Sequence, residues 1–482
     1  MNAPILKLFV LFLALFGALA ALTSWNTVLN AEAYRDNELN KRTLLAEQSI
    51  RRGTIRAQGG ALLARSVREG GRGAGLYERR YGDATQLFAH AVGYDFPLGI
   101  GRAGLERSRN DELIGTRKGL TSILDELRGE RQEGDNIVTN LDPAAQRVAV
   151  AGLQGRKGAV VAIEPASGKV RVMASTPGYD PRRLKENTVV SELSGDTANA
   201  PLVNRATQSG FPPGSTMKVI TAAAAIDSGM FTPDSTVDGG SPKQISGVAL
   251  KNFEDKSFGP TTLTDALTFS VNTVWAQVAE KLGRGRLNDY MRRFGFYEDP
   301  PIDYPDGQLI ASGLYDAKRR LIEASAGSVD IGRVGIGQER LRVTPLQMAT
   351  VAATIANDGV RLEPRLTDRV VDRDGRTVQD VRRRVARRVM KASTARKLNE
   401  MMGNVVREGS GTAAALEGID VAGKTGTAEL NLSGLNQPWF IGFASQRNPR
   451  VAVAVTIQDV QGGQGGTVAA PIAKSVIQEL LR

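Results

Sequence analysis

The chain has 482 residues, which is more than one hydrophobic core usually supports, so two or more domains are expected. Its 62 basic and 51 acidic residues leave a net charge of +11, which fits a nucleic acid, an anionic lipid surface or an acidic polymer and does not choose among them. The absence of cysteine and the presence of one histidine, His90, exclude disulfides, thiol catalysis, zinc–thiolate sites and multi-histidine metal sites. His90 lies far in sequence from the other candidate chemistry and is expected to be structural, so Lys, Asp, Glu or Tyr must carry any acid–base step.

The N-terminus carries an uninterrupted apolar segment. Every residue from Leu8 to Leu22 is apolar or glycine, Lys7 precedes the segment, and Trp25 follows it at the position of an interfacial aromatic residue. A bilayer span needs about 20 mainly apolar residues, so a retained membrane anchor over residues 1–29 is the favoured prediction. Because Ala18-Leu19-Ala20 has the small-x-small pattern of a processing site, a cleaved signal peptide is the alternative. Both interpretations send the remaining chain across the membrane.

Two domains are predicted after this segment. Residues 30–150 are rich in glycine and arginine and lack a long periodic stretch, which indicates a smaller, irregular pedestal domain. Residues 151–482 form the second domain. A β-hairpin pattern opens it, helical patterns fill its middle, and strands and an amphipathic helix end it, over residues 159–163, 170–173, 216–228, 273–282, 344–356, 421–430, 439–444, 451–457 and 471–481. This order predicts a layered, mixed α/β domain.

The densest basic run contains three arginines at 382–384 and two more at Arg387 and Arg388. Val385 and Ala386 interrupt it, which is typical of an edge strand or a helix with a solvated face. We therefore expect a solvated surface here rather than a binding patch.

A serine and a lysine in the middle of the chain form the first candidate for chemistry. Pro212-Pro213-Gly214 breaks the chain directly before Ser215, and a helical pattern follows. Lys218 lies one helical turn after Ser215, so its amine can approach the serine hydroxyl. By itself the pair has a simple alternative, in which Ser215 caps a helix and Lys218 is solvated.

Two further motifs make that alternative improbable. Ser270-Val271-Asn272 lies between two helical patterns, and Lys424-Thr425-Gly426-Thr427 opens a strand-like segment. Either motif alone reads as a helix cap or a strand end. Together with Ser215 and Lys218 they give Ser-x-x-Lys, Ser-x-Asn and Lys-Thr-Gly in that order, on helix, loop and strand.

This triple resembles the penicillin-binding proteins and their relatives, the active-site serine acyltransferases. Further blocks that fit class B of that family cover nearly the whole chain, and the small size and short pedestal resemble its PBPA-type subgroup. These blocks are residues 52–55, 88–94, 104–106, 204–205, 343–347 and 469–471. Ala57-Gln58 replaces the usual Asp-Arg, Glu339 a usual glycine, and Phe211 and Met217 the common aromatic pair beside the nucleophile.

The resemblance implies a penicillin-binding, serine β-lactamase-like transpeptidase fold, a mainly antiparallel sheet flanked by helices, on an α+β pedestal. It implies Ser215 as nucleophile, Lys218 as its base, Ser270 as a proton relay, Asn272 as a partner of Lys218 and of the substrate amide, and Lys424 as a second cation that lowers the pKa of Lys218. The backbone N–H groups of Ser215 and Thr427 would stabilise the oxyanion, the hydroxyls of Thr425 and Thr427 would hold the substrate carboxylate, and Gly426 would leave room for the substrate backbone.

The implied activity is D,D-transpeptidation of D-Ala-D-Ala stem peptides on the outer side of the cytoplasmic membrane, with inhibition by β-lactams. No cofactor, metal or nucleic acid is implied, and a SEDS-type membrane glycosyltransferase is the implied partner. A D,D-carboxypeptidase or β-lactamase shares every motif, and a non-catalytic scaffold of wall synthesis is a further alternative. The sequence does not decide the acceptor amine or whether the protein serves division, elongation or sporulation.

Overall fold

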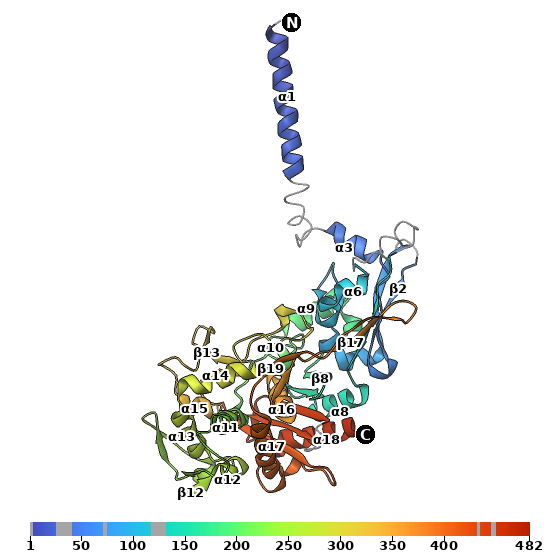
Figure 1. Cartoon of the computed structure of the whole chain (residues 1–482). Helices are drawn as coiled ribbons and strands as arrows, with labels where there is room; N and C mark the ends of the chain where they lie inside the picture. The colour runs from blue at the N-terminus through green and yellow to red at the C-terminus, as the bar shows by residue number, and fades with distance from the viewer. Residues whose placement is uncertain (1–2, 26–40, 71–74, 117–131, 431–433, 445–449) are drawn as a thin grey trace. The chain divides into compact units, whose positions relative to one another are not determined.

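The computed structural model describes residues 3–25, 41–70, 75–116, 132–430, 434–444 and 450–482 (Figure 1). The chain forms two compact units, which are described one at a time. The first consists of Met1–Arg51 and Val67–Glu78, and the second of Arg52–Ser66 and Arg79–Arg482.

The first unit contains a long apolar helix, α1 (Ala3–Ser24), and a short helix, α3 (Lys41–Gln48). α1 has 22 residues, a mean hydropathy of 2.6 and no buried side chain. Among the described residues it is the one helix long and apolar enough to cross a bilayer. The predicted apolar segment therefore forms one continuous helix.

The second unit contains an antiparallel sheet with the strand order β20-β21-β22-β7-β8. Its strands, together with β23 that pairs with β21, are β7 (Gly158–Ile163), β8 (Val170–Thr176), β20 (Val421–Glu429), β21 (Leu435–Ala444), β22 (Val451–Ile457) and β23 (Val460–Gln461). The predicted hairpin and the three C-terminal strands are confirmed. The turn predicted at residues 446–449 lies outside the described residues.

Helices cover both faces of this sheet. Successive side chains of a strand point to opposite faces, so each strand contributes side chains to both layers. Val160 and Ala162 of β7 belong to one core cluster with α8 (Pro143–Leu153) and α18 (Ala470–Leu481). Val161, between them, belongs to the other cluster, with α16 (Pro345–Ala356) and α11 (Lys218–Asp227). This arrangement confirms the predicted layered α/β class.

A long helical insertion separates β8 from β20 (Figure 1). Its predicted helices are confirmed with small shifts, and the first begins with a 3-10 turn, η6 (Gly214–Met217), that leads into α11. The other helices of the insertion are α9 (Asn187–Gly195), α10 (Arg205–Gln208), α12 (Leu263–Thr268), α13 (Asn272–Leu282), α14 (Arg284–Phe294), α15 (Ile331–Gly335) and α17 (Ala392–Arg407).

Short strands extend the insertion, and two pairs of them, β9 with β12 and β10 with β11, lie beside α12 and α13. Their bounds are β9 (Thr236–Asp238) with β12 (Pro260–Thr262), β10 (Lys243–Ile245) with β11 (Val248–Leu250), and β13 (Gly313–Tyr315) with β14 (Leu321–Ile322) and β15 (Leu341–Arg342). We call residues 236–262, which contain the first two pairs, the small lobe. These strands are too short to give a periodic sequence signal.

A second sheet has the order β18-β17-β6-β1-β2-β3. Its strands are β1 (Ile55–Arg56), β2 (Leu62–Arg68), β3 (Tyr77–Tyr81), β6 (Asn136–Thr139), β17 (Thr367–Val371) and β18 (Thr377–Asp380). β6 pairs in parallel with β1 and antiparallel with β17. Two strands from late in the chain thus complete a sheet that begins at residue 55.

Beside this sheet lie the short elements α4 (Ala89–Val92), β4 (Asp95–Phe96), β5 (Gly101–Arg102), α5 (Gly104–Ser108) and α6 (Asn110–Ile114). Buried ion pairs hold this region together. The fully buried Glu106 pairs with Arg52 at 3.1 Å and with Arg79 at 2.6 Å, and Arg52 also reaches Asp95 at 3.3 Å. Removing one partner of such a group would leave an uncompensated buried charge. Arg52, the first residue of the block at residues 52–55, therefore has a structural role.

His90 is buried in α4. Its Nε2 lies 2.9 Å from the carbonyl oxygen of Pro201, and its ring packs edge-on against Tyr179 at 5.2 Å. Burial lowers the pKa of His90 to about 4. These contacts fit the structural role that the sequence predicts.

The arginine run lies at a strand edge. β19 (Val385–Arg388) pairs with β16 (Val360–Leu362) in a two-stranded ribbon, and all five arginines of the run are exposed. The predicted edge strand with a solvated face is confirmed.

Candidate active site

Ser215 lies in a tight turn that glycine makes possible. The turn η6 leads directly into α11, and Gly214 in it has a φ of +52°. A Cβ on Gly214 would lie 2.9 Å from the carbonyl oxygen of Thr427, closer than side-chain carbons approach backbone oxygens. The N–H of Gly214 donates to the carbonyl of Gly337 at 3.0 Å. The turn is therefore pressed between β20 and the loop around Gly337, with Ser215 partly exposed.

Aromatic side chains fix the proline segment before the serine. The indole Nε1 of Trp439, in β21, donates to the carbonyl of Pro212 at 2.9 Å. Phe211 packs against the same indole, with ring centroids 6.3 Å apart at 70°. Trp439 thus connects the turn that carries Ser215 to the sheet.

Two fully buried lysines share one serine. Nζ of Lys218 donates to the carbonyl of Ser270 at 2.7 Å and to Oδ1 of Asn272 at 2.7 Å, and lies 3.1 Å from Oγ of Ser270. Nζ of Lys424 lies 3.0 Å from the same Oγ and donates to the carbonyl of Thr425 at 3.1 Å. The residues involved come from α11, the α12–α13 junction and β20.

Burial lowers the pKa of both amines, and like charge adds to this at Lys218. Loss of water is the main cause at Lys218, and the neighbouring charge of Lys424 adds to it, so the pKa of Lys218 is well below its usual value. Burial alone lowers the pKa of Lys424 to about 7. Because no carboxylate of the described residues pairs with either lysine, a neutral amine is available here near neutral pH.

The threonines of β20 have their own partners. Oγ1 of Thr425 and Oγ of Ser410 lie 2.5 Å apart, and the N–H of Gly465 donates to Oγ1 of Thr427 at 3.1 Å. A Cβ on Gly426 would lie 2.7 Å from the carbonyl oxygen of Pro213, so the close approach that requires this glycine is with the turn that carries Ser215. β20 is the outermost strand of its sheet, with one edge unpaired in the sheet.

The structure brings together the predicted residues from three distant parts of the sequence. Hydrogen bonds connect Lys218, Ser270, Asn272 and Lys424, and the close packing of Gly214 on Thr427 brings the serine turn to the same strand. Sequence reasoning missed Ser410, Gly465 and Trp439. The Gly-Ser-Gly and Gly-Gly-Gln-Gly-Gly runs around two of them were available signals.

Candidate metal ligands do not cluster at this site in the part of the chain that the structure describes. Within the described ranges no three His, Asp or Glu side chains are placed to hold an ion. The chemistry available is that of hydroxyls, amines and backbone N–H groups. A serine at a tight turn, beside two buried lysines on an antiparallel sheet, is the arrangement of an active-site serine acyltransferase.

Comparison with known proteins agrees with this class. The penicillin binding protein transpeptidase domain matches residues 158–478, and the penicillin binding protein A dimerisation domain matches residues 52–137. The chain therefore belongs to the penicillin-binding protein transpeptidase family.

Two relatives match over the whole length of the chain. Peptidoglycan D,D-transpeptidase PbpA of Mycolicibacterium smegmatis is 33% identical over 507 residues, spanning 100% of this chain and 99% of the relative. The PbpA of Mycobacterium tuberculosis is 32% identical over 508 residues, with the same coverage of both chains. Within the family, the chain is thus of the PBPA type.

Solved structures show the same fold. The ceftriaxone acyl-enzyme complex of penicillin-binding protein A from M. tuberculosis aligns with a TM-score of 0.81 at 31% identity, covering 91% of this chain and all of the other. A D,D-transpeptidase domain from Eggerthella lenta aligns with a TM-score of 0.78 at 31% identity, covering 90% of this chain and 98% of the other.

Proposed function

We propose that this chain is a peptidoglycan D,D-transpeptidase that forms an acyl-enzyme on Ser215. The observation that carries the proposal is the buried Lys218, bonded to Ser270 and Asn272 one helical turn from Ser215. Full-length relatives named peptidoglycan D,D-transpeptidase and neighbours solved as β-lactam acyl-enzymes support it.

Lys218 acts as the general base. A neutral amine has two hydrogens and one lone pair, and the two oxygens at 2.7 Å, the Ser270 carbonyl and Asn272 Oδ1, accept both hydrogens. The third and longest contact of the amine is with Oγ of Ser270 at 3.1 Å, and its lone pair takes up the Ser215 proton when the Ser215 hydroxyl replaces Ser270 at this position. As Ser215 attacks the carbonyl carbon of the penultimate D-Ala, its proton passes to Lys218.

Ser270 returns the proton to the leaving group. Its Oγ lies about 3 Å from both lysine amines, which makes it a hydroxyl that can receive a proton from one side and donate on the other. The C–N bond to the terminal D-Ala breaks, its nitrogen takes the proton, and the acyl group stays on Ser215. An amine of a second stem then attacks the ester, releasing Ser215 and forming the crosslink.

β20 holds the substrate. An extended stem peptide adds to the unpaired edge of this strand by backbone hydrogen bonds. The hydroxyls of Thr425 and Thr427, oriented by Ser410 and by the N–H of Gly465, bind the terminal carboxylate. The backbone N–H groups of Ser215 and Thr427 stabilise the oxyanion of the tetrahedral intermediate. β-Lactams, which mimic D-Ala-D-Ala, acylate the same serine.

α1 anchors the enzyme in the cytoplasmic membrane, with the catalytic part outside. At about 1.5 Å per residue its 22 residues span about 33 Å, close to the thickness of a bilayer core. We assign residues 1–29 to a membrane anchor, residues 30–150 to the pedestal domain and residues 151–482 to the transpeptidase domain. A SEDS-type membrane glycosyltransferase supplies the glycan strands.

Mass spectrometry after incubation with penicillin tests the proposal. We expect one adduct, of the mass of the intact drug, on the peptide that contains Ser215, and no adduct in Ser215→Ala. The matched control is Ser228→Ala, at the far end of α11, which keeps wild-type labelling. An adduct on another residue, or none, contradicts the proposal.

The same sample distinguishes a transferase from a hydrolase. A transpeptidase keeps the penicilloyl group for many minutes, whereas a β-lactamase frees its serine quickly. With D-Ala-D-Ala stem peptides and an acceptor amine, we expect crosslinked dimer to form; release of D-Ala without dimer would indicate a carboxypeptidase. Alkaline extraction of membranes with N-terminal sequencing tests whether α1 is retained.

A further inference from the structure

One short segment of the small lobe is bonded to the start of α13. Residues 251–256 lie between β11 and β12, and two consecutive residues of the segment bond two consecutive residues of the helix. The carbonyl of Lys251 accepts from Nδ2 of Asn272 at 3.1 Å, and Oδ1 of Asn252 accepts from the N–H of Thr273 at 2.9 Å. Both bonds form within one residue of the Ser270-Val271-Asn272 motif.

Asn252 is the buried centre of this connection. Besides accepting from Thr273, its Nδ2 donates to the carbonyls of Gly239 at 3.0 Å and Lys256 at 2.9 Å. The three bonds use both amide hydrogens and the amide oxygen. The residue before α13 is Val271, which has no side-chain cap to offer, so Asn252 supplies the helix cap from another part of the chain.

The bond from Asn272 to Lys251 decides which way the Asn272 amide faces. With Nδ2 held on the Lys251 carbonyl, Oδ1 must point to the other side, where Nζ of Lys218 lies 2.7 Å away. That oxygen takes one of the two hydrogens of a neutral Lys218. If the amide turned or drifted, that hydrogen would lose its acceptor and the lone pair would lose its fixed direction.

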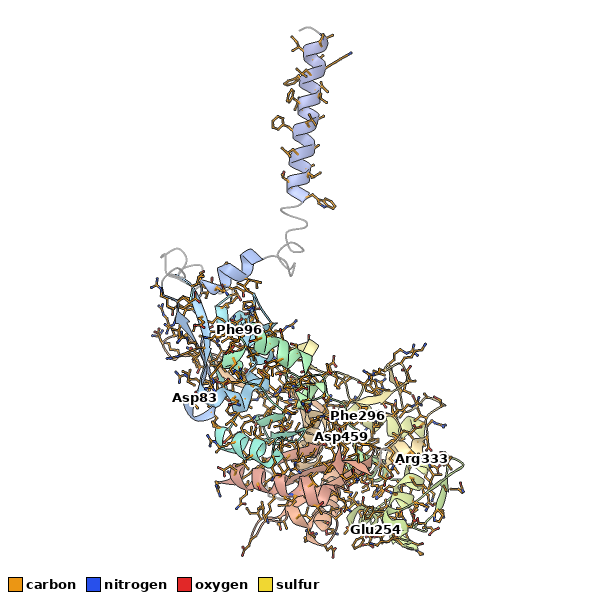
Figure 2. The ribbon with its side chains drawn as sticks, turned by 180° about the vertical axis from the view of Figure 1, so that it is seen from behind. Asp83, Phe96, Glu254, Phe296, Arg333 and Asp459 are labelled. Atoms are coloured by element: carbon orange, nitrogen blue, oxygen red, sulfur yellow. The ribbon has the colours of Figure 1, made fainter. Side chains whose placement is uncertain are left out.

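The segment acts on Lys218 by geometry rather than by charge. Its own charged side chains pair with each other, Lys251 with Asp255 at 3.1 Å and Lys256 with Glu254 at 2.8 Å, and all four are exposed. Figure 2 labels Glu254 at the surface of the small lobe. The charged group that faces Lys218 is Lys424, reached through Ser270 on the side away from the segment.

We propose that Asn252 is a positioning residue for acylation, which holds the Lys251 carbonyl against Asn272 and thereby directs the lone pair of Lys218 toward Ser215. The inference rests on the proposed function, in which Lys218 is the base. Asn252 itself touches no reacting atom. It couples the small lobe to the base through the backbone of its neighbour and the side chain of Asn272.

The test compares Asn252→Ala with the wild type in the full-length protein. The readouts are the second-order rate of acylation by a fluorescent penicillin from pH 5 to pH 9 and the midpoint of thermal unfolding. We expect the plateau rate to fall by about 10-fold to 100-fold, as for a small displacement of a catalytic group. Losing an acceptor of the Lys218 ammonium lowers the pKa of Lys218. We therefore expect the acid limb of the pH–rate profile, where the rate falls as Lys218 becomes protonated, to move to lower pH by about half a pH unit.

Gln277→Ala is the matched control. The Gln277 amide donates to the carbonyls of Asp238, in the small lobe, and of Thr273, so its loss also weakens the connection of the lobe to α13. It does not contact Asn272 or Lys251. We expect this variant to keep its acid limb and to acylate within about twofold of the wild type.

The outcomes separate the inference from the proposed function. A wild type that penicillin does not label contradicts the proposed function. If penicillin labels the wild type, two results overturn the inference alone. One is an acid limb of Asn252→Ala that stays at the wild-type pH. The other is an acylation rate of Asn252→Ala equal to that of Gln277→Ala. Asn252→Ser, which leaves a polar group in the site, replaces the alanine variant if that one does not fold. Failure of both variants to fold also overturns the inference, because the cap would then be purely structural.

Discussion

Replacing Lys424 by methionine should move the acid limb of acylation to higher pH. Acylation needs a neutral Lys218, and a charged Lys424 lowers the pKa of Lys218 by repulsion. In Lys424→Met the repulsion is absent and the pKa of Lys218 rises, although burial still keeps it below its usual value. The base is then protonated over a wider range of pH.

The magnitude follows from the positions of the two amines. Both lie about 3 Å from Oγ of Ser270, which places them within about 6 Å of each other. At about 5 Å and an effective dielectric constant of about 20, two unit charges repel by about 3 kcal/mol. At pH 6, below the pKa of about 7 of Lys424, we therefore expect acylation to slow by about 100-fold. Above pH 7 the wild type loses the same charge, so the difference narrows.

The assay is the second-order rate of labelling by a fluorescent penicillin from pH 5 to pH 9. Lys397→Met removes one positive charge from an exposed position on α17 and is the control for net charge. It should keep the wild-type profile. A Lys424→Met enzyme whose rate falls equally at all pH values, with its acid limb in place, would refute the electrostatic reasoning.

Three further variants test separate parts of the structure. Ser410→Ala removes the partner of the Thr425 hydroxyl, so KM for a D-Ala-terminated substrate should rise about fivefold with kcat unchanged, and a fall in kcat alone would contradict this. Gly214→Ala forces a Cβ to within 2.9 Å of the Thr427 carbonyl at positive φ, which should lower Tm by about 2 °C and nearly abolish labelling. His90 stays neutral in the fold down to a pKa of about 4, whereas the unfolded chain takes up a proton near pH 6.5, so stability should fall by about 3 kcal/mol between pH 6.5 and pH 4. His90→Gln should lose this component in urea unfolding, and an unchanged pH dependence would contradict it.

The candidate catalytic residues could be predicted because the three short motifs follow one another in the order Ser-x-x-Lys, Ser-x-Asn and Lys-Thr-Gly. The spacing of Ser215 and Lys218 follows from one helical turn. Lys218 contacts Ser270, which lies 52 positions later in the sequence, and Asn272, which lies 54 positions later. A local sequence pattern carries no information about contacts over such separations. Only the resemblance to a family could bring them together.

The small lobe and the second sheet could not be derived in the same way. Strands of two to five residues, such as β1 and β10, are shorter than the window that periodicity needs. The role of Asn252 depends on a helix cap supplied from 21 residues away in sequence. From the sequence alone, a polar residue in a loop is predicted to be solvated. Its capping role can be recognised only from the structure, where the helix lies beside it.

The pairing of β6 with β17 has a consequence for how the protein folds. Ile137 of β6 lies opposite Val370 of β17, more than 200 residues later. The sheet that begins at residue 55 therefore stays unfinished until the chain as far as β17 is available to pair. Such distant pairing is slow and leaves a strand edge open to wrong partners. The strands β1, β2 and β6 are therefore expected to form their complete sheet more slowly than strands that are neighbours in sequence.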